Sequence, residues 1–244
     1  MNTRRYIINI SGIAVEVIRK DIKNLHLGVY PPEGRVRVSA PVRLDDEAVR
    51  LAVISRLGWI RRKQKGFQEQ ARESRREMVT GESHYVDGRR LLLSVVVDEH
   101  RKRPMVRLKG NTTLEMVVPP RTDRDACERI LERWYRRRLR ERFPYLLQKW
   151  EPRVGIAVNE MRIKKMKTRW GSCNIQARRI WLNLELAKKH PACLEYVLVH
   201  EMVHFLERNH TRRFAELMDS FLPNWRMLRD ELNRAPLSHA EWRY

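Results

Sequence analysis

His200, Glu201 and His204 lie inside LEYVLVHEMVHFL, residues 194–206, which is the most apolar stretch of a chain in which 33% of residues are charged. Polar groups buried without a partner are costly, and a metal ion is the simplest partner for imidazole and carboxylate together. The segment is apolar nearly all round, which predicts a core helix, and Pro191 suits its first turn. On that helix His200 and His204 lie one turn apart on one face, while Glu201 is rotated by about 100° and lies beside them.

The five residues His200-Glu201-Met202-Val203-His204 form the HExxH arrangement of zinc peptidases, in which the histidines bind the metal and the glutamate polarises its water. A third histidine, His210, follows His204 by six residues, which is about 600° of helical rotation. It can therefore face the same metal only if the helix ends before it. Asn209 tolerates the left-handed conformation that ends helices, and Thr211 could cap a new helix that continues through Leu232.

We therefore predict a catalytic Zn2+ site in which His200, His204 and His210 bind the metal, a fourth position stays open for water, and Glu201 is the catalytic base. Two histidines at this spacing also occur as ordinary core or surface residues; the apolar helix and His210 favour zinc over that interpretation. Two neighbours lie on the same helix face. Cys193 precedes His200 by about 10 Å of helix, which favours a small buried hydrophobe over a ligand, whereas Glu207 could either orient a ligand imidazole or be a solvated surface residue.

Three motifs in a fixed order connect the chain to a known family. They are Thr168-Arg169-Trp170-Gly171-Ser172-Cys173, then Ile180-Trp181-Leu182-Asn183, then VLVHEMVHFLERNHTRRF. In order and spacing over residues 168–214 they resemble the YgjP-like metallopeptidases, relatives of the SprT, WLM and minigluzincin-like zinc peptidases. The resemblance implies the same three zinc ligands and the same base. Upstream, TGESHYVDGRRLLLSV is similar to the family's glycine-containing strand pair, with Val86-Asp87-Gly88-Arg89 in place of the usual Leu-Gly-Arg, and Ala215 stands where many members carry an aromatic residue.

The flanks MRIKKMKTRW and RRIWLNLEL predict two short strands of a β-hairpin, which turns at SCNIQARR and packs against the metal helix. In zinc peptidases of this shape an edge strand commonly receives an extended peptide by main-chain pairing. The candidate substrate-binding residues are therefore Arg169, Trp170, Gly171, Ser172, Cys173 and Asn183. By chemical type alone, Arg169, Asn183 and Arg213 are candidates for stabilising the oxyanion. A nucleophilic role for Cys173 is disfavoured, because no histidine is near it in sequence and zinc-activated water would not need it.

The 244 residues are enough for one large domain or two modest ones. We expect an α+β fold with two parts: a β-rich N-terminal region with one long helix over 1–118, and a zincin-like metallopeptidase domain over 119–244. In the first part, RRYIINI, IAVEVIRK, LHLGVY and RVRVSAP predict antiparallel strands, a helix is expected from Asp45 toward Met78, and strands return at LLLSVVV, MVRL and TTLEMVV. In the second part, Thr122 and Asp125 suggest a capping box for a helix through Trp150, which Pro144 should kink or divide.

The cysteine pattern and the hydropathy of the chain indicate its cellular compartment. Cys127, Cys173 and Cys193 form no CxxC pair and no even framework, which favours a reducing environment. No apolar run of signal-peptide or membrane-span length occurs, so we expect a soluble, cytoplasmic protein. The oligomeric state stays open at this stage.

The formal net charge of +21 is the second strong signal of the sequence. Such an excess attracts polyanions, of which nucleic acid is the commonest, although a merely basic soluble surface gives the same composition. Our leading interpretation is a zinc metallopeptidase acting on protein or peptide substrates. Two alternatives remain: a basic nucleic-acid-binding protein with a structural zinc site, and a SprT-like protease that acts on DNA-associated proteins. Basic clusters occur at Arg61-Arg62-Lys63, Arg75-Arg76, Arg101-Lys102-Arg103, Arg136-Arg137-Arg138, Lys164-Lys165 and Arg178-Arg179.

Overall fold

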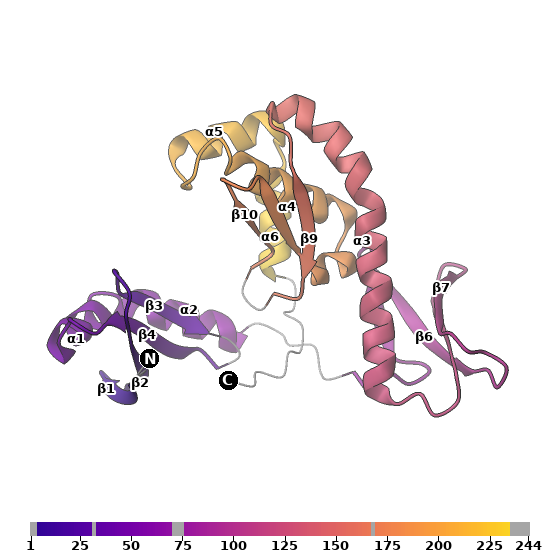
Figure 1. The fold of residues 1–244 in the computed structure, drawn as a ribbon, viewed down its shortest axis with the longest axis horizontal. Helices are drawn as coiled ribbons and strands as arrows, with labels where there is room; N and C mark the ends of the chain where they lie inside the picture. The colour runs from indigo at the N-terminus through magenta and orange to yellow at the C-terminus, as the bar shows by residue number, and fades with distance from the viewer. Residues whose placement is uncertain (1–3, 31–32, 70–75, 167–168, 235–244) are drawn as a thin grey trace. The chain divides into compact units, whose positions relative to one another are not determined.

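The computed structural model describes residues 4–30, 33–69, 76–166 and 169–234, and it confirms an α+β fold (Figure 1). The chain forms two compact units, residues 1–73 with 236–244, and residues 74–235. The expected boundary at 118/119 differs from this division, because the strands between 83 and 118 share one hydrophobic core with the long helix that follows them. The first unit has a separate core of its own.

The first unit contains a four-stranded sheet in the order β1-β2-β4-β3. Its strands are β1 (Arg5–Ile10), β2 (Ile13–Lys20), β3 (His26–Tyr30) and β4 (Arg35–Pro41). All four expected strands are confirmed, but the sheet is mixed, because β4 lies between β2 and β3 and runs parallel to β2. Alternate side chains of the two central strands, Val15 and Val17 on β2 and Val36 and Val38 on β4, are fully buried, as the period of a strand requires.

Two helices, α1 (Asp46–Ile54) and α2 (Leu57–Glu69), follow in place of the single helix expected from Asp45 to Met78. Asp45 is the N-cap, accepting a hydrogen bond from the Ala48 backbone. The helix breaks at Ser55, whose hydroxyl donates to the carbonyl of Ala52 and so competes with the helical ladder. Residues 70–75 lie outside the described residues, and Met78, with φ of 59°, is not helical.

The second unit begins with a four-stranded sheet in the order β5-β6-β8-β7. Its strands are β5 (Ser83–Val86), β6 (Arg89–Val97), β7 (Met105–Lys109) and β8 (Thr113–Val118), which confirms the three strands expected after residue 90. The family-like strand pair is the β5–β6 hairpin, and its two-residue turn is Asp87-Gly88. Both turn residues have positive φ, 54° and 80°, which is the conformation that an Asp-Gly hairpin turn supplies.

The N-cap of the long helix α3 (Arg124–Val154) is one residue later than the expected Thr122. Asp123 is the N-cap and accepts from Ala126, whereas the hydroxyl of Thr122 donates to the carbonyl of Pro119. Pro144 does not divide the helix, although Figure 1 shows that α3 is curved along its length. Helices accommodate an internal proline in this way by bending away from the lost hydrogen bond.

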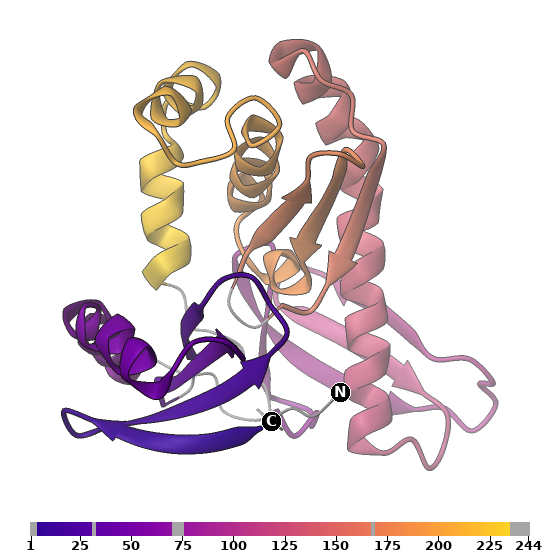
Figure 2. The same ribbon diagram turned by 60° about the vertical axis from the view of Figure 1, so that its left-hand side comes forward.

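The remaining elements form a three-stranded sheet and a set of helices around the HExxH segment. They are β9 (Glu160–Lys164), β10 (Gly171–Asn174), β11 (Arg179–Asn183), the 3-10 helix η1 (Leu184–Lys188), α4 (Pro191–Val203), α5 (Arg212–Phe221) and α6 (Trp225–Arg234). The strand order is β10-β11-β9, so a hairpin is present, but its first strand is β10, most of which was expected to belong to the turn. The expected first flank contains β9 instead, which pairs with the other side of β11 and runs parallel to it. Figure 2 shows α4 between this sheet and α6. The described part of the chain contains no helix with the length and apolarity that a membrane crossing requires.

Candidate metal centre

Helix α4 carries the HExxH residues through the core of the second unit. Pro191 occupies its first turn, and the His190 side chain caps it by accepting from the Ala192 backbone at 3.3 Å. Nine residues of the helix are buried, and Leu198 and Met202 are completely inaccessible, which confirms the expected core helix. Burial on all sides fixes the orientation of the histidine face.

The helix ends just where His210 can return to that face. The regular ladder stops at Val203, and tight turns follow, with Phe205 donating to Met202 and Leu206 donating to Val203. Asn209 does not adopt the left-handed conformation that we expected, because these turns already reverse the chain. Thr211 caps the next helix as expected, accepting from Phe214, but the helix expected through Leu232 is divided into α5 and α6.

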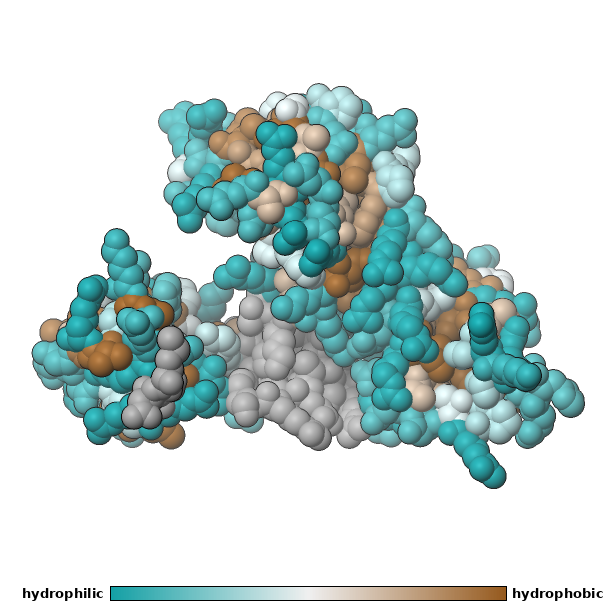
Figure 3. All heavy atoms as spheres, viewed as in Figure 1, coloured by the Kyte–Doolittle hydropathy of each residue, from teal (hydrophilic) through white to brown (hydrophobic). Residues whose placement is uncertain are grey.

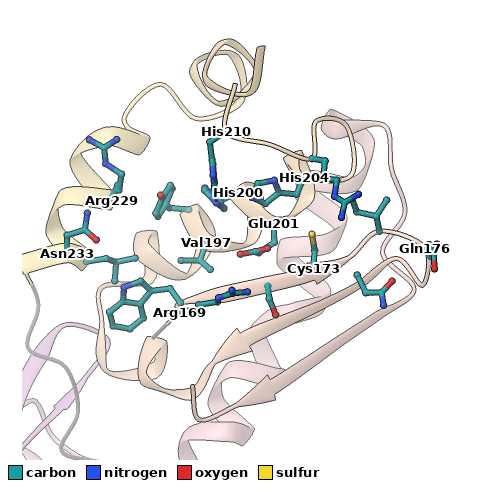
Figure 4. Close-up of a pocket in the computed structure, with 18 residues that line it drawn as sticks. Arg169, Cys173, Gln176, Val197, His200, Glu201, His204, His210, Arg229 and Asn233 are labelled. Carbon is teal, nitrogen blue, oxygen red and sulfur yellow. Dashed lines mark hydrogen bonds between the residues drawn. The ribbon is translucent and has the colours of Figure 1, made fainter. Parts of the chain in front are cut away.

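Three imidazoles converge at this reversal (Figure 4). One ligating atom from each of His200, His204 and His210 lies within 4.8 Å of the others. The Nε2 atoms of His200 and His210 are 3.0 Å apart. The Nδ1 atom of His204 lies 3.2 Å from the backbone carbonyl of Glu207, so this nitrogen carries the proton and Nε2 is left to bind. The partner of His204 is thus the backbone of Glu207, while the Glu207 carboxylate accepts from the Asn209 amide.

The electrostatics of the cluster suit a metal cation. Burial, reinforced by the neighbouring imidazoles, lowers the pKa of His200 to about 3, and burial also lowers the pKa of His204. Both rings are therefore neutral at pH 7, which is the state in which imidazole binds a metal. The Nε2 atoms of His200 and His210 face each other, and His200 Nδ1 is buried without a hydrogen-bond partner among the described residues. Converging nitrogen lone pairs of this kind fit a divalent metal such as zinc.

Glu201 is 6% exposed and lies against strand β10. Burial raises the pKa of its carboxyl group to about 7, while the Cys173 thiol, which donates a hydrogen bond, and the nearby charge of Arg169 act in the opposite direction. A Cβ atom at Gly171 would lie only 2.7 Å from Glu201 Oε1 and 2.8 Å from Val197 Cγ1. The glycine and the cysteine of the RWGSC motif therefore form the surface against which the carboxylate rests.

A cleft of about 1100 Å³ contains these groups. Figure 4 shows Arg229 and Asn233 at one end, Gln176 at the other, and Glu201 with the three histidines between them. Strand β10 forms one wall, and it is the edge strand of its sheet. The lining residues are Arg169, Trp170, Gly171, Ser172, Cys173, Asn174, Ile175, Gln176, Tyr196, Val197, His200, Glu201, His204, Arg208, His210, Arg229, Leu232 and Asn233.

Five of the six candidate substrate-binding residues, Arg169 to Cys173, line this cleft, and Asn183 does not. The Asn183 side chain is buried, and both its nitrogen and its oxygen form hydrogen bonds outside the cleft. Its nitrogen donates to the carbonyls of Met166 and Arg169, and its oxygen accepts from the amides of Met166 and Glu185. Asn183 thus holds the segment that leads into β10, and it cannot also bind an oxyanion. Thr168 lies outside the described residues.

The other sequence candidates also lie away from the cleft. Arg213 is an exposed residue of α5 and does not line it. Cys193 is fully buried, which agrees with its interpretation as a small core residue; burial, followed by the charge of Glu231, raises the pKa of its thiol to about 12. Cys173 is half-buried, and its pKa is raised to about 11 chiefly by burial, so it is a thiol rather than a nucleophilic thiolate at pH 7.

Sequence reasoning missed several cleft residues. Tyr196 precedes His200 by four residues, so its place on the histidine face could have been found from helical spacing. Its ring meets that of His200 edge-on at 5.8 Å and stacks on Trp225 at 6.5 Å. Arg208, Arg229 and Asn233 had no comparable signal, because their positions depend on the turn after α4 and on the return of α6.

The cleft of this α+β fold contains converging histidines, a buried glutamate and an edge strand. This arrangement is typical of metallopeptidases. The YgjP-like family model, described as a metallopeptidase domain, matches residues 23–235, and the chain belongs to this family. Its family thus implies a divalent metal and protein or peptide substrates. Among solved structures, the metallopeptidase zymogen abylysin of Pyrococcus abyssi is similar at 18% identity, over 36% of this chain and 90% of that one, with a TM-score of 0.34. Comparison with curated proteins gives no match.

Proposed function

We propose that the chain is a zinc peptidase in which His200, His204 and His210 bind Zn2+ and Glu201 is the general base. The observation that carries this proposal is the juxtaposition of three converging imidazole nitrogens with a buried carboxylate in one cleft. A site with three protein ligands leaves the fourth zinc position open, which is what catalytic zinc requires. When bound, zinc would act as a Lewis acid on the scissile carbonyl and lower the pKa of water to about 7.

Glu201 would accept a proton from the attacking water as its oxygen bonds to the carbonyl carbon. The same carboxyl group would then return the proton to the amine as the carbon–nitrogen bond breaks. Its position against Gly171 and the hydrogen bond from Cys173 support this role, because they hold the carboxylate in one place. A base that is held in position needs no reorganisation during the reaction.

Strand β10 would bind the substrate backbone. Among the described strands it pairs with β11 alone, so its other side is open to main-chain pairing with an extended peptide. Main-chain pairing gives affinity with little dependence on sequence, and the side chains of Arg169 to Cys173 would contact the peptide from this wall. Arg169, whose charge acts to lower the pKa of Glu201, is the remaining candidate for stabilising the oxyanion.

Metal content and turnover together test the proposal. Wild-type protein loaded with zinc should contain about one zinc ion per chain and hydrolyse peptide substrates. His210→Ala should lose or much weaken zinc binding, measured by mass spectrometry. Glu201→Gln should keep the zinc and lose activity by at least about 100-fold, since a positioned general base contributes about 10² to 10⁴.

Failure to bind zinc in the wild type would exclude zinc as the metal that the histidines hold. A zinc-loaded Glu201→Gln variant that hydrolyses peptides as fast as the wild type would exclude Glu201 as the base. Zinc binding without any hydrolysis would favour a structural site in a basic binding protein.

A second candidate function is contact with nucleic acid through helix α3. Arg129, Arg133, Arg137 and Arg140 recur at helical spacing and are all exposed, which places them on one face over about 16 Å. Arg137 has only Glu141 at 3.6 Å, and among the described residues no carboxylate pairs with the other three. Figure 3 shows mainly hydrophilic residues over the lower half of α3, where the helix begins. A row of exposed guanidinium groups of this length suits a phosphate backbone.

Duplex DNA binding, measured by anisotropy at several salt concentrations, tests this second function. The combined variant Arg129→Gln, Arg133→Gln and Arg140→Gln should bind more weakly and reduce the salt slope by about one for each phosphate that it no longer neutralises. DNA that stimulates peptide hydrolysis would link the two functions. No binding by the wild type at low salt would exclude this role for α3.

A further inference from the structure

The charge of the cleft is one-sided. Three arginines, Arg169, Arg208 and Arg229, line it, while the single carboxylate among the described lining residues is the buried Glu201. The charged groups that a substrate side chain meets in the exposed part of the cleft are therefore cationic. Inside a concave site the field of such groups is concentrated, because the low-dielectric walls displace water.

The three arginines differ in how much of their charge is available. Arg229 pairs with its neighbour Asp230 at 3.0 Å, which compensates part of its charge. Arg169 lies near Glu201, so its charge acts on the reacting centre. Arg208 is exposed, follows directly after Glu207, whose carbonyl supports His204, and forms no ion pair with a carboxylate of the described residues. Arg208 is thus the cation beside the histidine cluster that remains free for a ligand.

We propose that the cleft selects peptides with an acidic side chain near the cleaved bond, and that Arg208 is the main specificity-determining residue, with Arg229 as a second. The inference rests on the proposed peptidase function, since it names the substrate class of the same site. The backbone pairing offered by β10 is indifferent to side-chain charge, so selection has to come from the other walls of the cleft. A lysine in the same substrate position would be opposed by like charges, and selectivity arises from this repulsion as well as from the attraction of glutamate.

The test compares matched peptides that carry Glu, Gln or Lys at each of the two positions on either side of the cleaved bond. With zinc-loaded full-length protein, kcat/KM should be about tenfold higher for Glu than for Lys at one or more positions, and the ratio should fall with added salt. Arg208→Gln should reduce the Glu-to-Lys ratio several-fold, because it removes the charge that distinguishes the two peptides. Arg208→Lys should largely restore the ratio, because the charge is retained.

Arg103→Gln is the matched control, since this exposed arginine lies between β6 and β7 and does not line the cleft. It removes the same charge and should leave the ratio unchanged. Binding of the same peptides to zinc-loaded Glu201→Gln, followed by fluorescence anisotropy, measures the charge preference without turnover.

The outcomes separate the two proposals. Equal kcat/KM and equal affinity for Glu and Lys peptides, or a ratio unaffected by Arg208→Gln, would overturn the specificity proposal and leave the peptidase intact. A preference for the Glu peptide in binding that depends on Arg208, without hydrolysis by the wild type, would support the acidic-ligand site and overturn the peptidase.

Discussion

Gly171 lies where no other residue fits without moving the proposed catalytic base. A Cβ atom there would be 2.7 Å from Glu201 Oε1, 2.9 Å from Glu201 Cγ and 2.8 Å from Val197 Cγ1. These distances are too short to be tolerated, and Val197 is fixed in the core of α4, so the Glu201 side chain would have to yield. The role of this glycine is therefore to permit close approach of β10 to the HExxH helix.

Gly171→Ala should thus reduce kcat/KM by about 100-fold, the cost typical of a displacement of about 1 Å at a reacting group. Zinc content should not change, because Glu201 is not among the proposed ligands. Peptide hydrolysis and mass spectrometry on the same sample measure the two effects. Gly66→Ala is the control: an added Cβ there meets no heavy atom within 4 Å, so this helical substitution should keep full activity and add up to about 1 kcal/mol of stability. A fully active Gly171→Ala variant would contradict the proposed role of the glycine.

At the scale of residues, the sequence predicts positions that follow from helical spacing. It does not predict contacts that form only when the chain turns back on itself. The spacing of His200 and His204, and the need for a chain reversal before His210, could be derived from 3.6 residues per turn. The support of His204 by a backbone carbonyl could not, since carbonyls carry no sequence signature. Asn183 was misassigned for a related reason: a buried amide with four hydrogen bonds and a substrate-binding amide have the same chemical type.

The β5–β6 hairpin is joined to α3 by the side chain of Asp87. Arg138 and Arg142 of α3 both approach Asp87 Oδ2, at 2.6 and 2.7 Å. The backbone of the same turn donates to the carbonyls of Ala187 and Lys188 at the end of η1, each at 3.0 Å. One turn therefore connects the first sheet of the second unit to α3 and to the segment that precedes α4.

Asp87→Ala should destabilise the second unit by about 1–3 kcal/mol, because it removes two ion pairs, of which the one with Arg138 is also a charge-assisted hydrogen bond, and leaves two partly buried arginines close together. Urea unfolding followed by far-UV circular dichroism measures the change. Glu216→Ala removes a pair whose members are 60% and 94% exposed, so this control should change stability by less than about 0.5 kcal/mol. Equal effects of the two substitutions would show that Asp87 does not join the elements.

At the scale of elements, the sequence predicts which helices and strands exist better than it predicts where they end or which strands pair. Alternating segments predicted the four strands of the first sheet, apolar segments predicted β6, β7 and β8, and the apolar run predicted α4, whereas β5 was suggested only by the family resemblance. The segment 161–170 was expected to be one strand, but it contributes β9 and leads into β10 on opposite sides of β11. Local pattern cannot reveal this, because the order of strands is decided by tertiary pairing. The parallel pairs β2–β4 and β6–β8 were missed for the same reason.

At the scale of the whole molecule, the division of the chain follows from which residues share a core. Val86, Leu91 and Leu114 of the first sheet in the second unit belong to the same cluster as Leu131 and Trp134 of α3. The core of the first unit contains none of them. A change from strands to a long helix suggested the boundary at 118/119, but such a change does not separate cores, since a sheet commonly buries its apolar face against a helix.

The separation of cores predicts that residues 74–235 fold and bind zinc without the first unit. All three histidines, Glu201 and the described cleft lie within this range, and its buried residues form one continuous cluster. A metal that binds only the folded state raises stability in proportion to the logarithm of its concentration. Zinc should therefore raise the Tm of the fragment by an amount similar to the rise in the full chain. His210→Ala in the fragment should abolish the rise and retain a cooperative transition. A fragment that unfolds without cooperativity, or whose Tm ignores zinc while the full chain responds, would mean that the first unit is required to form the metal centre.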